Sequence, residues 1–146
     1  MGKLTEHNTA LLASKEIEVR FSEVDSIGIV WHGAYALYFE DAREAFGQKY
    51  GLGYMDIFRN DYYAPLVELT FNYKLPLAYE QKARVDIFYK NSEAAKIIFE
   101  YKIHSLDNKN LIATGRSVQV FLDKQYQLVW TNPPFYVEWK KKNGLI

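Results

Sequence analysis

One stretch near the start of the chain and four from residue 67 onward alternate between apolar and polar residues. The first alternation begins at Lys15 and places Ile17, Val19 and Phe21 on its apolar face, and the others occupy residues 67–73, 85–89, 97–103 and 111–122. A repeat of two places successive side chains on opposite faces of an extended backbone. Each stretch is therefore predicted to be a half-buried β-strand.

Between residues 34 and 50 the spacing changes to a helical repeat. The apolar side chains recur every three or four positions and so share one face of a helix: Tyr35, Tyr38, Phe39, Ala42 and Phe46. Gly51 and Gly53 are typical of the end of a helix. Residues 54–59 are predicted to form a second, short helix.

This order of elements, one strand, a long helix and four strands, predicts an α+β fold. A single helix among several strands must bury its apolar face against their sheet, so we expect a curved antiparallel sheet wrapped around the helix. The pattern indicates one domain over residues 1–146. Residues 1–14 are expected to be a flexible arm, and residues 124–146 a tail that becomes loop or a short helix after Pro133-Pro134.

Composition excludes several functional classes. Lys plus Arg and Asp plus Glu number 18 each, and the formal net charge is zero, so no global field favours nucleic acid or an anionic membrane. The chain has no Cys, which excludes disulfides, a thiolate nucleophile and zinc–thiolate sites. We find no signal-peptide pattern and no apolar run long enough to span a membrane. A cytoplasmic location is predicted.

The candidate chemistry lies in the loop between the first strand and the long helix. This loop contains Asp25, Gly28 and His32 and leads into a helix N-terminus. Backbone N–H groups are unpaired at such a terminus and favour negative charge. A carboxylate that attacks or activates water, beside N–H donors that hold an oxyanion, is a minimal apparatus for acyl transfer.

Each of these residues also has a plainer interpretation. Asp25 and Gly28 are common turn residues, and a single His at a loop–helix junction is more often a cap than a catalyst. Trp31 is as compatible with the core as with a pocket. A further group lies at helical ion-pair spacing and is interpreted as a helix-surface network: Glu40, Arg43 and Glu44.

The run FSEVDSIGIVWHGAYALYFEDAR, residues 21–43, resembles the signature of acyl-CoA thioesterases of the 4-hydroxybenzoyl-CoA thioesterase type. That signature reads approximately Asp-x-Asp-x-x-Gly-x-Val-x-His, followed by Tyr and then by an acidic residue and Ala-Arg. The departure is Glu23, where family members often have Asp. The order of elements is similar over residues 15–123. The matching residues are Glu23, Asp25, Gly28, Val30, His32, Tyr35, Glu40, Ala42 and Arg43.

The resemblance implies a hot-dog fold and hydrolysis of an acyl-CoA or acyl carrier protein thioester. It places Asp25 on the family's catalytic carboxylate, as nucleophile or general base, and gives His32, through its backbone N–H, a role in polarising the thioester carbonyl. The residues expected to bind substrate are Gly28, Val30, Trp31 and Tyr35.

The same resemblance implies no metal and no separate cofactor, since coenzyme A is part of the substrate. Hot-dog sites form between protomers, so a homodimer or homotetramer is expected. Two alternatives stay open. One is a hydratase or dehydratase of acyl thioesters on the same fold, and the other is a non-catalytic module that binds acyl thioesters.

Overall fold

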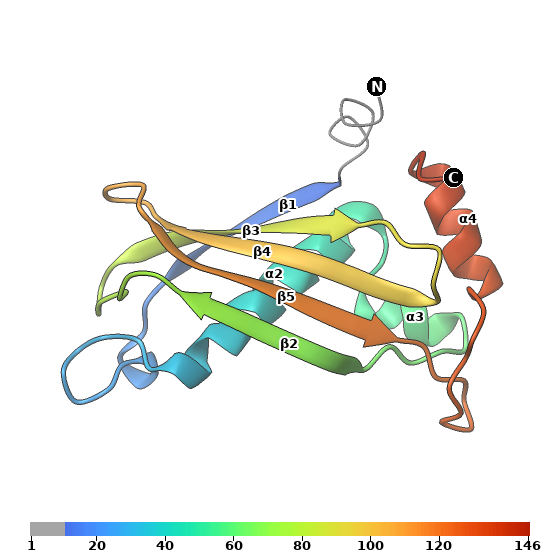
Figure 1. Ribbon diagram of the computed structural model, residues 1–146, viewed down its shortest axis with the longest axis horizontal. Coiled ribbons are helices and arrows are strands. Elements are labelled where there is room, and N and C mark those ends of the chain that lie inside the picture. Colours follow the sequence, from blue (N-terminus) through green and yellow to red (C-terminus); the bar gives the residue numbers. More distant parts are fainter. Residues whose placement is uncertain (1–10) are drawn as a thin grey trace.

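Five strands and three α-helices make up the computed structural model, which describes residues 11–146 (Figure 1). The strands are β1 (Leu12–Glu18), β2 (Leu66–Tyr73), β3 (Lys82–Lys90), β4 (Lys96–Ser105) and β5 (Leu111–Val120). The α-helices are α2 (Tyr35–Tyr50), α3 (Tyr54–Arg59) and α4 (Pro134–Lys142). Two 3₁₀ turns, η1 (Phe21–Glu23) and η2 (His32–Ala34), lie between β1 and α2.

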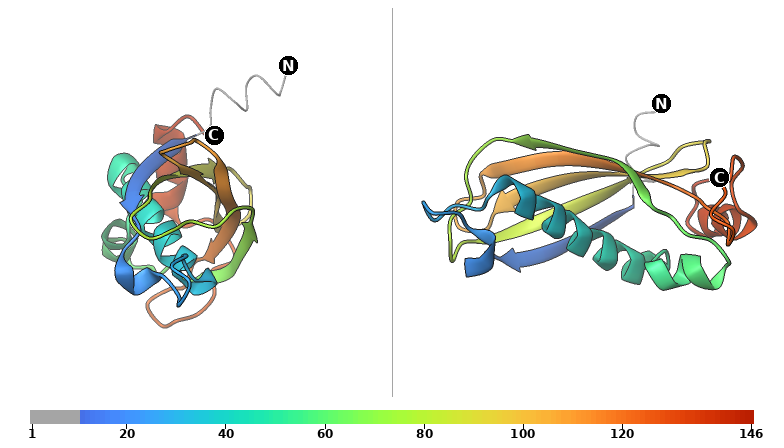
Figure 2. Two further views of the ribbon diagram at one scale, coloured as in Figure 1. Left: turned by 90° about the vertical axis from the view of Figure 1, so that its left-hand side faces the viewer. Right: turned by 90° about the horizontal axis from the view of Figure 1, so that it is seen from below.

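The strands form one antiparallel sheet in the order β1-β3-β4-β5-β2. Figure 2 shows the sheet curling around α2, which lies along its concave face and packs mainly on β1 and β3. This arrangement is the hot-dog fold, and the predicted fold class is confirmed. At the opposite edge from β1, strand β2 pairs with β5 alone among the described strands.

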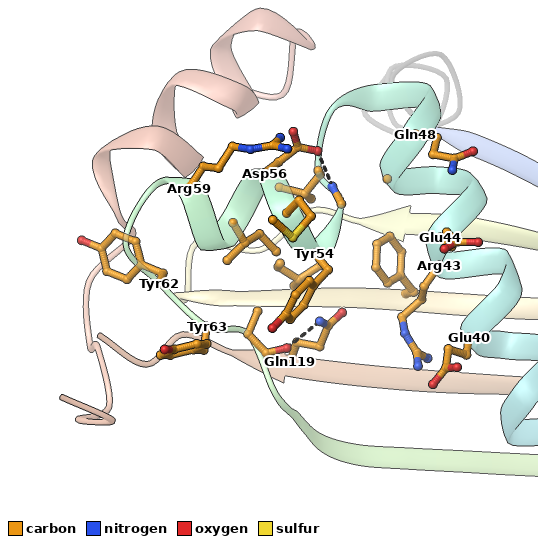
Figure 3. Close-up of a pocket in the computed structure, with 18 residues that line it drawn as sticks. Glu40, Arg43, Glu44, Gln48, Tyr54, Asp56, Arg59, Tyr62, Tyr63 and Gln119 are labelled. Atoms are coloured by element: carbon orange, nitrogen blue, oxygen red, sulfur yellow. Dashed lines mark hydrogen bonds between the residues drawn. The ribbon is translucent and has the colours of Figure 1, made fainter. Parts of the chain in front are cut away.

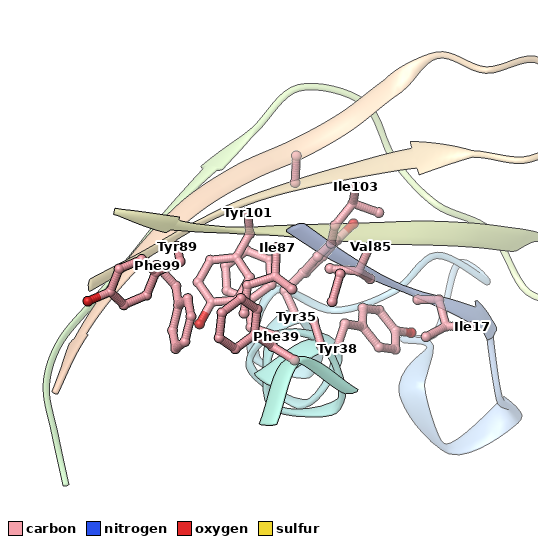
Figure 4. Packing of buried hydrophobic residues seen from close by; sticks show 14 of the residues in the cluster. Ile17, Tyr35, Tyr38, Phe39, Val85, Ile87, Tyr89, Phe99, Tyr101 and Ile103 are labelled. Carbon is pink, nitrogen blue, oxygen red and sulfur yellow. The ribbon is translucent and has the colours of Figure 1, made fainter. Parts of the chain in front are cut away.

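The centre of the core is a stack of two aromatic rings, one from α2 and one from β4 (Figure 4). Phe39 and Tyr101 lie 4.0 Å apart between ring centroids and are almost parallel. Both are buried, and such a pair stabilises the fold by roughly 1 kcal/mol beyond area burial. Gly115 on β5 faces this stack, and a Cβ there would overlap the Phe39 ring. The helix can therefore approach the sheet closely at this point.

The predicted N-terminal arm is partly wrong. Strand β1 begins at Leu12, and Ala13 is buried, so residues 12–14 belong to the sheet; the rest of the predicted arm, up to residue 10, lies outside the described residues. Phe21 also differs from the prediction. It was expected to continue the buried face of the first strand, but it lies in η1 and is exposed.

The C-terminal segment is packed against the body of the protein rather than forming a tail. Tyr136 and Trp139 of α4 are buried, and Trp139 Nε1 donates to the carbonyl oxygen of Tyr50 at 2.7 Å. Lys140 is also buried and donates from Nζ to the carbonyl oxygen of Ser92. This helix closes the core at the end opposite the loop that precedes α2 (Figure 1).

No helix in the described part of the chain has the length and apolar character needed to cross a membrane.

Candidate active site

Asp25 lies at the tip of a short hairpin between β1 and α2. Its backbone N–H donates to the carbonyl oxygen of Ile29 at 2.8 Å, and Gly28 N–H donates to the carbonyl oxygen of Asp25 at 3.1 Å. The side-chain Oδ1 of Asp25 accepts from the N–H groups of Ile27 and Ile29 at 3.0 and 3.4 Å. Gly28 has φ of 79°, which favours glycine. Asp25 therefore is a turn residue, and its carboxylate is exposed.

The hairpin is attached to the segment that precedes β3. Tyr79 N–H donates to the carbonyl oxygen of Gly28 at 3.0 Å, and Val30 N–H donates to the carbonyl oxygen of Leu77 at 2.8 Å. Val30 is buried. These bonds hold the hairpin against the protein, so that the exposed carboxylate of Asp25 projects from an anchored turn.

His32 marks the point at which the loop becomes helix. It is the first residue of η2, which continues directly into α2. Within residues 11–146, the backbone N–H groups of His32 and Gly33 donate to no protein acceptor, whereas Ala34 N–H donates to the carbonyl oxygen of Trp31 at 3.0 Å. The His32 carbonyl oxygen accepts from the Tyr73 hydroxyl at 3.1 Å. This helix start thus has two free donors, as the sequence predicts.

Asp25 and His32 share one loop, but no hydrogen bond or ion pair joins their side chains in the described part of the chain. A bridge between Val24 and Val30 pairs the two sides of the hairpin. The loop therefore carries both groups without a hydrogen bond or ion pair between their side chains.

Trp31 is half-exposed, at 47% of its accessible surface, so the core interpretation of this residue is wrong. Its ring packs edge-to-face on His32, with centroids 5.6 Å apart. A Cβ on Gly33 would overlap the Trp31 ring. The indole therefore lies over the backbone of the helix start, beside the free N–H groups.

Tyr35 is buried and packs edge-to-face on Tyr73 at 5.1 Å. Burial raises the pKa of the Tyr35 hydroxyl, and the neighbouring Tyr73 raises it further. With His32 and Lys74, these two residues line a small cavity of about 260 Å³ beside the helix start. Tyr35 is thus both a core residue and part of a wall near the site.

A larger cavity of about 660 Å³ lies at the other half of α2 (Figure 3). Polar residues of α2 and α3 line one side, and Phe99 and Ile97 of β4 line the other. Tyr54 projects into this space, and Gln119 donates to the carbonyl oxygen of Ala64 at 2.7 Å. The sequence analysis did not predict this cavity, because its residues come from five separate segments with no common motif.

Arg43 lines this cavity and corrects the predicted surface network. Its Nη1 donates to the Tyr101 hydroxyl at 3.1 Å, and Tyr101 in turn shares a hydrogen bond with Ser117. Among the described residues, Arg43 forms no ion pair with Glu40 or Glu44. The guanidinium therefore points toward the core, where it adds a donor to the buried pair of Tyr101 and Ser117.

Comparison with known proteins identifies the family. The model of the family described as "Thioesterase-like superfamily" matches residues 19–139. The chain belongs to this superfamily. The match includes the whole hairpin, the helix start and the five-segment cavity, so all parts of the candidate site lie within the shared domain.

Two relatives by sequence support this membership. YneP of Bacillus subtilis, a candidate acyl-CoA thioesterase, is 33% identical over 114 residues, which cover 78% of this chain and 82% of YneP. The chloroplastic acyl-acyl carrier protein thioesterase ATL3 of Arabidopsis thaliana is 30% identical over 114 residues, which cover 78% of this chain but 60% of ATL3. The match to this chain thus spans less than two thirds of the length of the plant relative.

Solved structures agree on the fold. The DHNA-CoA thioesterase of Staphylococcus aureus superposes with a TM-score of 0.80 and 26% identity, covering 90% of this chain and 89% of that one. Slr0204, a 1,4-dihydroxy-2-naphthoyl-CoA thioesterase of Synechocystis, has a TM-score of 0.76 at 17% identity, covering 86% and 93%. The second likeness supports the fold alone.

Proposed function

We propose that this chain hydrolyses acyl-CoA thioesters to a free acid and coenzyme A, with Asp25 as nucleophile or general base. The observation that carries the proposal is one anchored loop holding an exposed carboxylate and the free N–H groups of His32 and Gly33. The superfamily membership supports the same reaction. Neither group needs help from a metal or redox cofactor for this chemistry, and we propose none.

Two routes use these groups. In the nucleophilic route an Asp25 oxygen bonds to the carbonyl carbon, the C–S bond breaks, and the thiolate takes a proton from solvent. Water then hydrolyses the mixed anhydride and restores the carboxylate. In the general-base route Asp25 takes a proton from water as the water oxygen attacks the carbonyl carbon. The C–S bond then breaks, and the leaving thiolate takes the proton from Asp25, which restores the carboxylate. In both, the N–H of His32 stabilises the negative charge on the carbonyl oxygen.

Rapid-quench mass spectrometry separates the routes. An acyl adduct on the peptide that contains Asp25, formed and lost within one turnover, requires the nucleophilic route. A quenched enzyme of unmodified mass throughout a turnover that releases product favours the general-base route.

We further propose that the site is completed by a second copy of the chain. Strand β2 is an edge strand; its start, Leu66, follows the cavity-lining residues Tyr63 and Ala64, and its end, Tyr73, contacts His32. Antiparallel pairing of two β2 edges would place the Leu66 end of one protomer beside the Tyr73 end of its partner. Each 660 Å³ cavity would then lie next to the partner's helix start and could receive the acyl group.

Exposed apolar residues at both ends of the protomer support this assembly. Phe21, Ile27 and Leu75 are exposed near the hairpin, and Tyr54 and Trp130 are exposed at the far end. Burial of these side chains against a partner would remove their apolar surface from water. A homodimer is the minimum assembly in this proposal, and a tetramer built from two such dimers is its extension. The cytoplasmic location stays a prediction.

An acyl carrier protein thioester is the second candidate substrate, because ATL3 is an acyl-acyl carrier protein thioesterase. One panel tests both: purified chain with acyl-CoA and acyl carrier protein thioesters, and with release of free thiol as the readout. We expect hydrolysis by the wild type and its near-complete loss in Asp25→Asn. Hydration of an enoyl-CoA without thioester cleavage would favour the hydratase alternative, and ligand binding without turnover would favour a binding module.

A further inference from the structure

Glu23 is a buried carboxylate, 8% exposed, that the proposed reaction does not use. Its Oε1 accepts two hydrogen bonds, from the Tyr38 hydroxyl on α2 and from the backbone N–H of Arg20, both at 2.9 Å. Its own carbonyl oxygen accepts from Trp31 N–H at 3.1 Å. One residue thus joins the end of β1, the base of the hairpin and the long helix.

Burial of a carboxylate is unfavourable unless strong hydrogen bonds hold it. Both donors to Glu23 Oε1 form charge-assisted bonds, which are about twice as strong as neutral ones. Burial, followed by the hydrogen bond to Glu23, raises the pKa of Tyr38. Tyr38 therefore stays protonated and can donate throughout the ordinary pH range. It is 2% exposed and packs on Tyr35, with centroids 5.8 Å apart, so its position on the helix is well determined.

The geometry of the hairpin makes this contact relevant to the site. The two sides of the hairpin are held by Trp31 N–H to Glu23 and by Asp25 N–H to Ile29. Asp25 lies two residues beyond Glu23 on one side, and His32 directly follows Trp31 on the other. Within residues 11–146, the Glu23–Tyr38 bond is the one side-chain hydrogen bond that ties the base of this hairpin to α2.

We propose that Glu23 is a positioning residue that, through Tyr38, sets where the Asp25 carboxylate lies relative to the N–H of His32. This inference rests on the proposed function. Glu23 touches no reacting atom; it acts by orienting the hairpin on the helix that carries the oxyanion donors. A displacement of about 1 Å between reacting groups lowers rates by roughly 100-fold, so a loosened hairpin changes kcat more than substrate affinity.

The test compares kcat and KM for Tyr38→Phe and Glu23→Gln. Tyr38→Phe removes the donor from α2, and we expect kcat to fall by roughly 10- to 100-fold with little change in KM. Glu23→Gln keeps an acceptor of the same reach but without charge, and we expect a smaller fall, on the order of threefold to tenfold. In an Asp25→Asn background, Tyr38→Phe should lower the residual rate no further, because its effect passes through Asp25.

Tyr89→Phe is the matched control. It also removes a buried tyrosine hydroxyl that is hydrogen-bonded, here to Tyr136, but at the far end of the core. We expect a similar fall in unfolding temperature with unchanged kcat. Wild-type kcat in folded Tyr38→Phe or in Glu23→Gln, or an equal fall in Tyr89→Phe, would overturn the inference. If Tyr38→Phe does not fold, Glu23→Gln decides alone. A wild type that hydrolyses no thioester of the panel overturns the proposed function instead.

Discussion

Asp25 and Asp123 close two turns with the same hydrogen-bonding pattern. In each turn the Asp Oδ1 accepts from the N–H groups two and four residues later, at 3.0 and 3.4 Å for Asp25 and at 2.9 and 3.0 Å for Asp123. Each also has a left-handed residue at its fourth position, Gly28 or Tyr126. Only the Asp25 turn lies beside a helix start with free N–H donors. Asp123 is therefore an internal control that separates the turn role of Asp25 from a role in catalysis.

This pair separates chemistry from local structure. Asn retains the Oδ1 acceptor, so both Asp25→Asn and Asp123→Asn should fold with unfolding free energies within about 1 kcal/mol of wild type. Asp25→Asn should lower kcat for thioester hydrolysis by at least about 100-fold, because an amide neither attacks nor takes a proton. Asp123→Asn should leave kcat unchanged. Comparable losses in both variants, measured by thiol release, would assign Asp25 a turn role alone.

If the site is formed by two protomers, as proposed, two inactive variants should restore activity when they are combined in one dimer. Asp25→Asn removes the carboxylate, and Ala64→Trp should place a bulky ring in the 660 Å³ cavity and obstruct it. Each variant alone should be inactive. In a mixed dimer, the intact Asp25 of one protomer faces the open cavity of the other, so one of the two sites should recover activity. Co-expression with two different affinity tags and thiol release by the mixed species checks this. An inactive mixed dimer would mean that each protomer uses its own cavity.

Gly33→Ala should affect activity more than stability. The new methyl group would overlap the Trp31 ring, but that ring is half-exposed and can move into solvent. We expect a change of less than about 1 kcal/mol in unfolding free energy and a fall of roughly tenfold in kcat/KM, because the indole no longer covers the helix start. Thermal unfolding and steady-state kinetics measure both. If displacement of the ring is the cause, Gly33→Ala should not lower kcat/KM further in a Trp31→Ala background. Losses of kcat/KM that add up in the double variant would contradict that cause.

Lys140 should make stability depend on pH in the alkaline range. Its burial lowers the pKa of the ammonium, while Glu93 nearby opposes that shift. The unfolded state then binds more protons than the folded state between the folded pKa and the ordinary value of about 10.4. The unfolding free energy should therefore rise as pH rises through that window, because the folded state no longer buries a charged ammonium. Below the window Lys140 is charged in both states, and the full cost of burying that charge lowers stability.

Lys140→Met keeps much of the side-chain volume and removes the titrating group. Urea unfolding of both proteins between about pH 7 and about pH 10 should show that the difference in unfolding free energy, wild type minus variant, increases with pH. A difference that is constant across this range would show that the folded and unfolded pKa values of Lys140 are the same.

The pattern of the sequence was sufficient for the secondary structure and the fold class. A repeat of two predicts strands and a repeat of three to four predicts the helix, whatever their partners. The helix predicted over residues 34–50 agrees with α2, which spans Tyr35–Tyr50. The boundaries at Leu12 and Phe21 were predicted less well, because the pairing of β1 with β3, rather than its own alternation, determines where the strand begins and ends.

By itself, then, the sequence determined a curved sheet around one helix and a loop with a carboxylate next to a helix start. Both follow from local periodicity and from the backbone chemistry of turns and helix ends. The tertiary structure alone decided that Glu23 is buried against Tyr38, that Arg43 turns inward to Tyr101, and that a 660 Å³ cavity lies at the far half of α2. Those outcomes depend on segments far apart in the chain. Their energies come from burial and from satisfying buried polar groups, which exist only once the chain has packed.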